Sequence, residues 1–126
     1  MDDAEQQVHE LLDRFMDALN AYDPAGMDAC LHFPHVRIAD RQVVVYEQAG
    51  NNPMDLFDRL KAADGWHRSE WVHRRPSLRN DHKLHMEVRY TRLREDGSVI
   101  GIYDSLYIAT KLDGSWGIQA RSSFGP

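Results

Sequence analysis

Asp104 is the acidic residue whose surroundings best suit chemistry, because it interrupts a row of apolar residues at two-residue spacing that includes Ile102 and Leu106. If the last predicted turn has two residues, Asp104 lies opposite Ser123 and diagonal to Arg121. A carboxylate in apolar surroundings beside an arginine has a shifted pKa, which suits a general base or a ligand anchor. A structural ion pair at the sheet surface is the alternative. A single β-bulge would exchange the two faces, so the strand register decides between these interpretations.

Two histidines lie in the segment His32-Phe33-Pro34-His35, which we expect between the second helix and the first strand. Histidine titrates near pH ~6.5, so either His32 or His35 can transfer a proton in a pocket. A hydrogen-bonded structural histidine is the alternative. No third ligand of suitable spacing lies nearby in the sequence, so we expect no metal site.

Large rings with a single polar atom suit a mostly apolar ligand site, and Tyr22, Trp66, Trp71 and His73 are candidates for lining one. Packing in the core is the alternative for each of these residues. The sequence contains no glycine-rich phosphate loop, nucleophile elbow or metal cluster. We therefore expect a small-molecule ligand and no cofactor.

Length and charge narrow the classes of partner. The 126 residues fit one domain spanning residues 1–126. The net charge of -5 gives no attraction to phosphate backbones, so we expect no nucleic acid partner. The N-terminus is acidic and no run of 18 apolar residues occurs, so we expect no membrane association and a cytoplasmic location. Cys30 is the only cysteine, which excludes an internal disulfide and agrees with that location.

Three helices are predicted in the N-terminal half. Residues 8–22 place apolar side chains at spacings of three and four, which gives one apolar stripe. Asp23-Pro24 is a capping residue followed by a first-turn proline, and it predicts a second helix that runs to Leu31. Asn52-Pro53 repeats this signal, and Gly65 is a suitable stop for the third helix.

The remaining residues are predicted to form strands. Two short runs, 36–38 and 43–46, flank a polar loop and indicate a loose hairpin. Asp-Gly pairs at 96–97 and 113–114 predict hairpin turns, so the last three strands form an antiparallel meander. Helices first and an antiparallel sheet last are typical of an α+β fold. The longer strands are predicted at residues 69–79, 83–94, 99–111 and 115–124.

Both faces of the strand at 99–111 are expected to be covered. Ile102, Leu106 and Ile108 lie on one face, and Tyr103 and Tyr107 lie on the other. A strand with one solvated face alternates apolar with charged residues. Three helices can cover only one face, so we predict a homodimer through the other face of the sheet. Partial exposure of the tyrosines is the alternative.

The order of these elements, the segment 15–23 and the segment 113–118 resemble the nuclear transport factor 2-like superfamily. That superfamily includes SnoaL-like polyketide cyclases and ketosteroid isomerase. The resemblance covers nearly the whole chain. It implies a cystatin-like cone, in which a curved antiparallel sheet wraps around three N-terminal helices, with frequent dimers. It also implies a pocket at the wide end that serves enzymes and binding proteins alike.

Ketosteroid isomerase-like enzymes use a tyrosine and a protonated aspartate to hold an oxyanion, and another aspartate as the base. The resemblance places the tyrosine position at Phe15, the oxyanion aspartate near Ile108, and the base within one residue of Asp40. Neither Phe15 nor Ile108 can donate a hydrogen bond to an oxyanion. We therefore expect Asp40 at the pocket but do not expect steroid isomerisation.

The sequence thus predicts a SnoaL-like domain that binds a small, mostly apolar molecule inside the cone. If the domain performs acid/base chemistry, the candidate catalytic residues are Asp104, His35 and Arg121. The alternative is a non-enzymatic homodimeric binding or interaction module with a filled pocket. The candidate lining residues are Tyr22, His32, Asp40, Trp71, His73 and Ser123.

Overall fold

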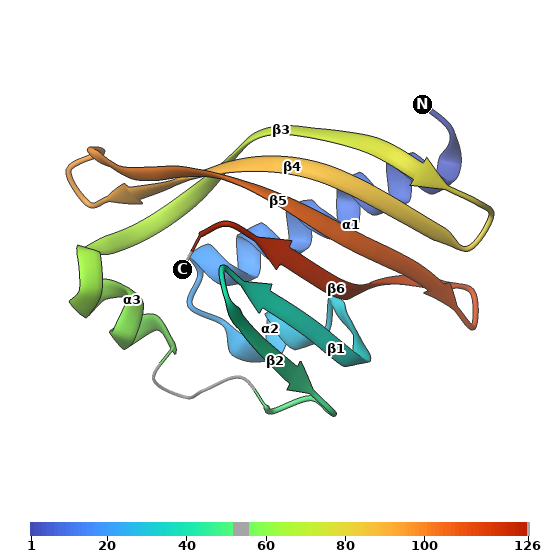
Figure 1. Ribbon diagram of the computed structural model, residues 1–126, viewed down its shortest axis with the longest axis horizontal. Coiled ribbons are helices and arrows are strands. Elements are labelled where there is room, and N and C mark those ends of the chain that lie inside the picture. Colours follow the sequence, from blue (N-terminus) through green and yellow to red (C-terminus); the bar gives the residue numbers. More distant parts are fainter. Residues whose placement is uncertain (52–55, 126) are drawn as a thin grey trace.

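The computed structural model of the protein describes residues 1–51 and 56–125. Helix α1 (Asp3–Asn20) begins after Asp2, whose carboxylate accepts a hydrogen bond from the Glu5 backbone at 2.9 Å. This cap satisfies one of the free N–H groups of the first turn. Helix α1 lies along the concave face of the sheet (Figure 1). Its buried side chains include Val8, Leu11, Leu12 and Phe15.

Helix α2 (Pro24–Asp28) is shorter than predicted, because strand β1 (Leu31–Ala39) begins where the helix was expected to continue. The backbone N–H of Ile118 donates to the carbonyl of Cys30 at 2.8 Å. Pairing with a strand from the far end of the chain therefore decides the conformation here, and local sequence could not reveal it. His32 and His35 lie on β1 and not in a connecting loop, which corrects the prediction.

Strand β2 (Gln42–Tyr46) pairs with β1 as the predicted hairpin. Helix α3 (Leu56–Asp64) follows, and Gly65 ends it with a φ of 74°, in the left-handed region that glycine adopts readily. The predicted helix start at Asn52-Pro53 lies outside the described residues.

Four long strands follow: β3 (Trp66–Arg79), β4 (Lys83–Arg94), β5 (Val99–Leu112) and β6 (Ser115–Ser123). The last three form the predicted antiparallel meander, and β3 extends it by pairing antiparallel with β4. The turn at Asp113-Gly114 has positive φ at both residues, 51° and 81°, which matches the twist of a two-residue hairpin.

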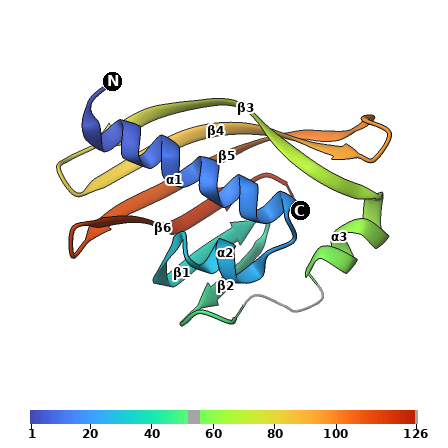
Figure 2. The same ribbon diagram turned by 180° about the vertical axis from the view of Figure 1, so that it is seen from behind.

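The six strands make one curved sheet in the order β2-β1-β6-β5-β4-β3, with β2 and β3 at its edges. All neighbours are antiparallel except β1 and β6, which run parallel. Helices α1 and α2 cover the concave side, and α3 lies beside the start of β3 (Figure 2). The predicted α+β class with a curved sheet is confirmed, with one parallel pair that was not expected. Within the described ranges, no helix is long and apolar enough to cross a membrane.

A bulge in β6 sets which side chains point toward α1. Ala109 pairs with Ile118, but the next pair along is Ile108 with Ala120, so Gln119 is an extra residue in its strand. The side-chain amide of Gln119 donates to the carbonyl of Pro34 at 2.5 Å. Beyond the bulge every pair is displaced by one residue relative to the register predicted from the turn. We call the face of the sheet toward α1 the inner face and the opposite face the outer face.

Candidate functional site

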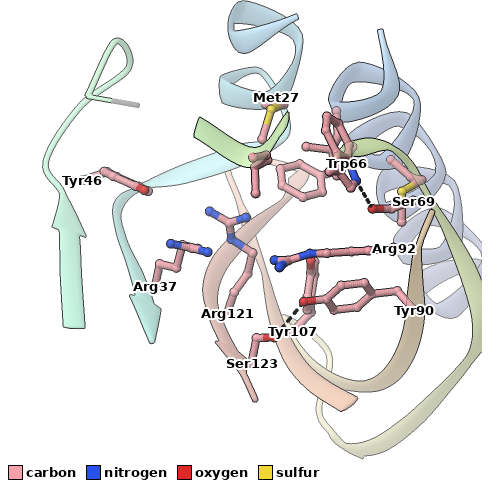
Figure 3. Close-up of a pocket in the computed structure, with 14 residues that line it drawn as sticks. Met27, Arg37, Tyr46, Trp66, Ser69, Tyr90, Arg92, Tyr107, Arg121 and Ser123 are labelled. Carbon is pink, nitrogen blue, oxygen red and sulfur yellow. Dashed lines mark hydrogen bonds between the residues drawn. The ribbon is translucent and has the colours of Figure 1, made fainter. Parts of the chain in front are cut away.

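A cavity of about 90 Å³ lies on the inner face of the sheet, beside the C-terminal half of α1 (Figure 3). Its walls are mostly apolar where α1, α2, α3 and the start of β3 approach, and its polar groups come mainly from β1, β4, β5 and β6, which form the floor, with one each from β2 and β3. The apolar and aromatic lining residues are Phe15, Met16, Leu19, Met27, Leu60 and Trp66. The polar lining residues are Arg37, Tyr46, Ser69, Tyr90, Arg92, Tyr107, Arg121 and Ser123.

Three arginines from three strands reach this cavity, and none of the described lining residues is acidic. Arg37 of β1 and Arg121 of β6 are register partners in the parallel pair, so their side chains leave neighbouring points of the sheet. Arg92 extends from β4 toward them (Figure 3), and its guanidinium carbon lies 5.0 Å from the centroid of the Tyr103 ring. The cavity therefore has a strongly cationic floor.

His35 holds the guanidinium of Arg121 in place. Arg121 Nε donates to His35 Nε2 at 2.9 Å, and His35 Nδ1 lies 2.9 Å from the carbonyl oxygen of Ile118. A carbonyl oxygen can only accept, so Nδ1 carries the proton and Nε2 is the acceptor. The His35 ring also stacks on Tyr46, with their centroids 5.9 Å apart and 6° between their planes. His35 is a positioning residue behind the cavity wall.

Burial shifts the pKa values of the groups in this cluster. Burial, with a contribution from the nearby Arg121 charge, lowers the pKa of His35 to about 3, so the ring stays neutral. Burial also lowers the pKa of Arg121 from its usual value, and Arg37 adds to this effect while Tyr107 opposes it. Burial raises the pKa of the Tyr107 hydroxyl, which interacts with the Arg121 guanidinium.

Hydrogen bonds among the other polar groups fix their orientation. The hydroxyl groups of Tyr90 and Ser123 lie 2.9 Å apart, and the indole nitrogen of Trp66 donates to the Ser69 hydroxyl at 2.9 Å (Figure 3). The face of the Phe15 ring lies 5.0 Å from the guanidinium carbon of Arg121, within cation–π distance. The polar groups of the floor are therefore held in fixed orientations on the strands, and Phe15 of α1 packs against Arg121.

Of the residues predicted to be catalytic, the structure brings Arg121 and His35 together and leaves Asp104 outside. The carboxylate of Asp104 lies on the outer face, where Oδ1 accepts from Arg89 Nε at 2.8 Å and the side chain is 54% exposed. The prediction that Asp104 faces the cavity beside Arg121 is wrong. The bulge at Gln119 pairs Arg121 with Tyr107, whereas an unbulged hairpin would have set it opposite Leu106.

Of the predicted lining residues, Ser123 and Trp66 line the cavity, and two others form a second layer behind its wall. The Tyr22 hydroxyl donates to the carbonyl of His67 at 2.7 Å, and its ring packs edge-on against Trp66. The Trp71 indole nitrogen donates to the carbonyl of Leu12 at 3.3 Å, and its ring meets Tyr107 edge-on.

The other three predicted lining residues lie away from the cavity. His32 Nδ1 is 2.9 Å from the hydroxyl of Thr110, and its ring lies over Gly117, where a Cβ would clash with it. Asp40 is exposed in the β1–β2 turn with a φ of 53°, and His73 is exposed on β3. Their predicted places in the pocket are wrong, because each lies at a turn or on a strand side whose direction depends on pairings that local sequence does not specify.

The sequence analysis missed Arg37, Arg92, Tyr46, Tyr90 and Tyr107. The signal was present in β4, where alternate residues from Leu84 to Tyr90 are buried and Arg92 continues the same row. An arginine in an inward-facing row marks a polar site, since an isolated charge in a core is unfavourable. The row could be recognised only once the inner face was known.

A sequence profile of the family described as "NTF2-like protein (DUF6841)" matches residues 4–123 of the chain. The chain belongs to this NTF2-like family. The resemblance to the nuclear transport factor 2-like superfamily seen in the sequence is confirmed. No curated protein matches the sequence.

Several solved structures share the fold of this NTF2-like protein. A protein of unknown function with a cystatin-like fold from Nostoc punctiforme has a TM-score of 0.76 at 17% identity, covering 94% of this chain and 88% of that chain. A structure from Catenulispora acidiphila in complex with S-DNPA has a TM-score of 0.73 at 14% identity, and the match covers 95% of this chain and 91% of that chain. Aln2 from a Streptomyces species has a TM-score of 0.72 at 15% identity, and the match covers 98% of this chain and 90% of that chain. These likenesses establish the cystatin-like fold.

The neutral state of His35 predicts a pH dependence of stability. Its pKa is about 3 in the folded chain against an ordinary value of 6.5, so the unfolded chain binds the extra proton between these values. The free energy of unfolding should therefore fall as pH is lowered through this window, by roughly 2 kcal/mol between pH 7 and pH 5. Urea denaturation at several pH values measures it.

His35→Gln keeps an acceptor for Arg121 but removes the titrating ring, so it should flatten this part of the pH profile. The exposed His82 supplies a matched control. His82→Gln should show the same dependence of unfolding free energy on pH as the wild type. Identical profiles for His35→Gln and the wild type would show that His35 is not held neutral.

Proposed function

We propose that this NTF2-like protein binds a small, mostly apolar organic molecule in the cavity between α1 and the inner face of the sheet. The observation that carries the proposal is a cavity with apolar walls on three helices and oriented polar groups on its floor. Ligand sites in proteins combine these two features, because apolar walls supply affinity and a few fixed polar groups supply orientation.

The size of the cavity limits the ligand. Its volume of about 90 Å³ is below the ~300–1,000 Å³ of sites for drug-sized ligands and nearer the ~150 Å³ of a cavity that holds benzene. A short branched chain or a single ring fits this space better than a fused-ring molecule. Empty space on this scale also argues against the alternative of a pocket filled by its own side chains.

The lining chemistry favours binding over proton transfer. The described lining residues include neither a carboxylate nor a histidine, which are the usual general bases. His35 lies behind Arg121, and both of its ring nitrogens are engaged in hydrogen bonds. A neutral histidine whose pKa is about 3 is a weak base. We therefore favour a binding protein over an enzyme of acid/base type.

The structure from Catenulispora acidiphila in complex with S-DNPA supports ligand binding by this fold. Its identity to this chain is 14%, so the proposal for this chain rests on its own cavity.

We also propose that a second copy of the chain covers the outer face of the sheet. Ile102 is 58% exposed there. Leu106 and Ile108 lie on the same side of β5, an interior strand of the sheet. Exposed apolar side chains grouped on the middle of a sheet favour association, and a two-fold axis would pair this face with itself.

The binding proposal is tested with protein carrying ¹³C-methyl methionine. Met16 and Met27 line the cavity, whereas Met86 is fully buried elsewhere in the core. A library of organic molecules with up to about ten non-hydrogen atoms is screened by NMR. Binders should shift the methyl signals of Met16 and Met27 and leave that of Met86 in place, because only the first two touch the ligand.

Met86 serves as the reference inside the same molecule. A library in which no compound moves the Met16 and Met27 signals, or in which every binder moves Met86 equally, would contradict a ligand site in this cavity.

The dimer proposal predicts twice the monomer mass of 14.6 kDa in light scattering at micromolar concentration. Leu106→Lys should shift the mass to that of the monomer, because the charge would have to be buried in the interface. Val43→Lys alters an exposed apolar residue on the edge strand β2 and should leave the dimer intact. A monomeric wild type would refute the proposal.

A further inference from the structure

We infer that the ligand of this cavity is a small organic acid, whose carboxylate binds Arg121 and Arg37 while its apolar body lies against the helices. This inference rests on the proposed function and names the class of ligand. It follows from the charge of the floor, the direction of the guanidinium groups and the character of the opposite wall.

Arg37 and Arg121 of the floor have no carboxylate partner among the residues that the structure describes. Elsewhere in the structure, several arginines on the sheet are paired with carboxylates: Arg74 with Asp13, Arg75 with Glu87, Arg79 with Asp2 and Arg89 with Asp104. Neither Arg37 nor Arg121 forms such an ion pair with any described residue. Arg37 and Arg121 are both half-buried. Charges that have lost part of their contact with water are commonly paired in proteins, so a bound anion would complete this cluster.

The two guanidinium groups also repel each other. Arg37 contributes to the lowered pKa of Arg121, as expected for like charges close together in a partly buried site. Two like charges this close together are mutually unfavourable. An anion placed between the two side chains would relieve this repulsion, and this relief favours anionic over neutral ligands.

The geometry suits a carboxylate. Arg121 uses Nε to bind His35, and its terminal nitrogens lie on the cavity side (Figure 3). A guanidinium presents five N–H donors, so donors remain for two carboxylate oxygens. The hydroxyl of Ser123 and that of Tyr107 lie on the same floor and can add hydrogen bonds.

The opposite wall selects an organic acid over an inorganic anion. Met27 and Trp66 face the arginines across the cavity (Figure 3), and the Trp66 indole nitrogen is already used in its hydrogen bond to Ser69. Phe15 adds an apolar ring to the lining. Phosphate or sulfate would leave this apolar surface uncovered, whereas a short branched chain or a ring would cover it. The volume of about 90 Å³ suits an acid such as isobutyrate, with benzoate near the upper limit.

The test compares each acid with its neutral amide of nearly the same shape. Isobutyrate, isobutyramide, benzoate and benzamide are titrated against the whole chain, and binding is followed by the methyl signals of Met16 and Met27. At least one acid should bind about 10- to 100-fold more tightly than its amide, because a hydrogen bond to a charged group is worth more than a neutral one. Inorganic phosphate is titrated in parallel.

Variants of Arg37 and Arg121 test whether these residues cause the preference for the acid over its amide. Arg37→Met should remove most of the preference for the acid, and Arg121→Met should do the same. Arg89→Met removes an arginine of the outer face and should leave the preference unchanged. Arg37→Met should also melt at the same temperature as the wild type or above it, because it relieves the repulsion. A purely structural arginine would lower the melting temperature when replaced.

The possible results distinguish a failure of the carboxylate assignment from a failure of the proposed ligand-binding function. Amides that bind as tightly as the acids would overturn the carboxylate assignment and leave a neutral ligand for the cavity. Phosphate that binds more tightly than either acid would overturn the organic class. If no probe moves the methionine signals, the inference fails, and the wider library decides the proposed function on its own.

Discussion

The site depends on holding the Arg121 guanidinium at the cavity without a carboxylate from the described part of the chain beside it. Such a charge is costly to bury, and here a neutral acceptor, a ring face and a phenol share that cost. His35 accepts from Nε at 2.9 Å, Phe15 offers its ring face at 5.0 Å, and Tyr107 interacts with the guanidinium. None of these groups carries a negative charge. Arg121 is therefore held in a fixed position with no carboxylate of the described residues paired to it, which suits the binding of an anion.

The position of this guanidinium follows from one extra residue in β6. Up to Ile118 the last hairpin keeps the register that its two-residue turn dictates, and beyond Gln119 the register is displaced by one. This displacement sends Arg121 and Ser123 to the inner face beside Tyr107. Asp104 goes to the outer face with Arg89. The bulge is anchored by bonds from Gln119 to the β1 backbone, so the parallel pairing of β1 with β6 and the site geometry depend on each other.

This dependence explains what the sequence could and could not predict. The apolar stripe of α1, the Asp-Gly turns and the strand meander are local patterns, and they were predicted together with the NTF2-like family. Arg121 and Ser123 were also selected correctly, although for a register that placed them beside the wrong carboxylate. The inner face of β5 was misjudged, because its tyrosines are less apolar than the isoleucines of the outer face. Arg37 went unnoticed, because its closeness to Arg121 arises from a pairing between opposite ends of the chain.

The central claim is that Arg121 is the anchor of an anionic ligand, and a crystal structure of the complex with benzoate or isobutyrate tests it most directly. The account predicts carboxylate oxygens about 2.7–2.9 Å from the terminal nitrogens of Arg121, with the apolar part of the ligand against Phe15. Binding in the reverse orientation, with the carboxylate directed away from Arg121 and the apolar part of the ligand over the arginines, would contradict the account.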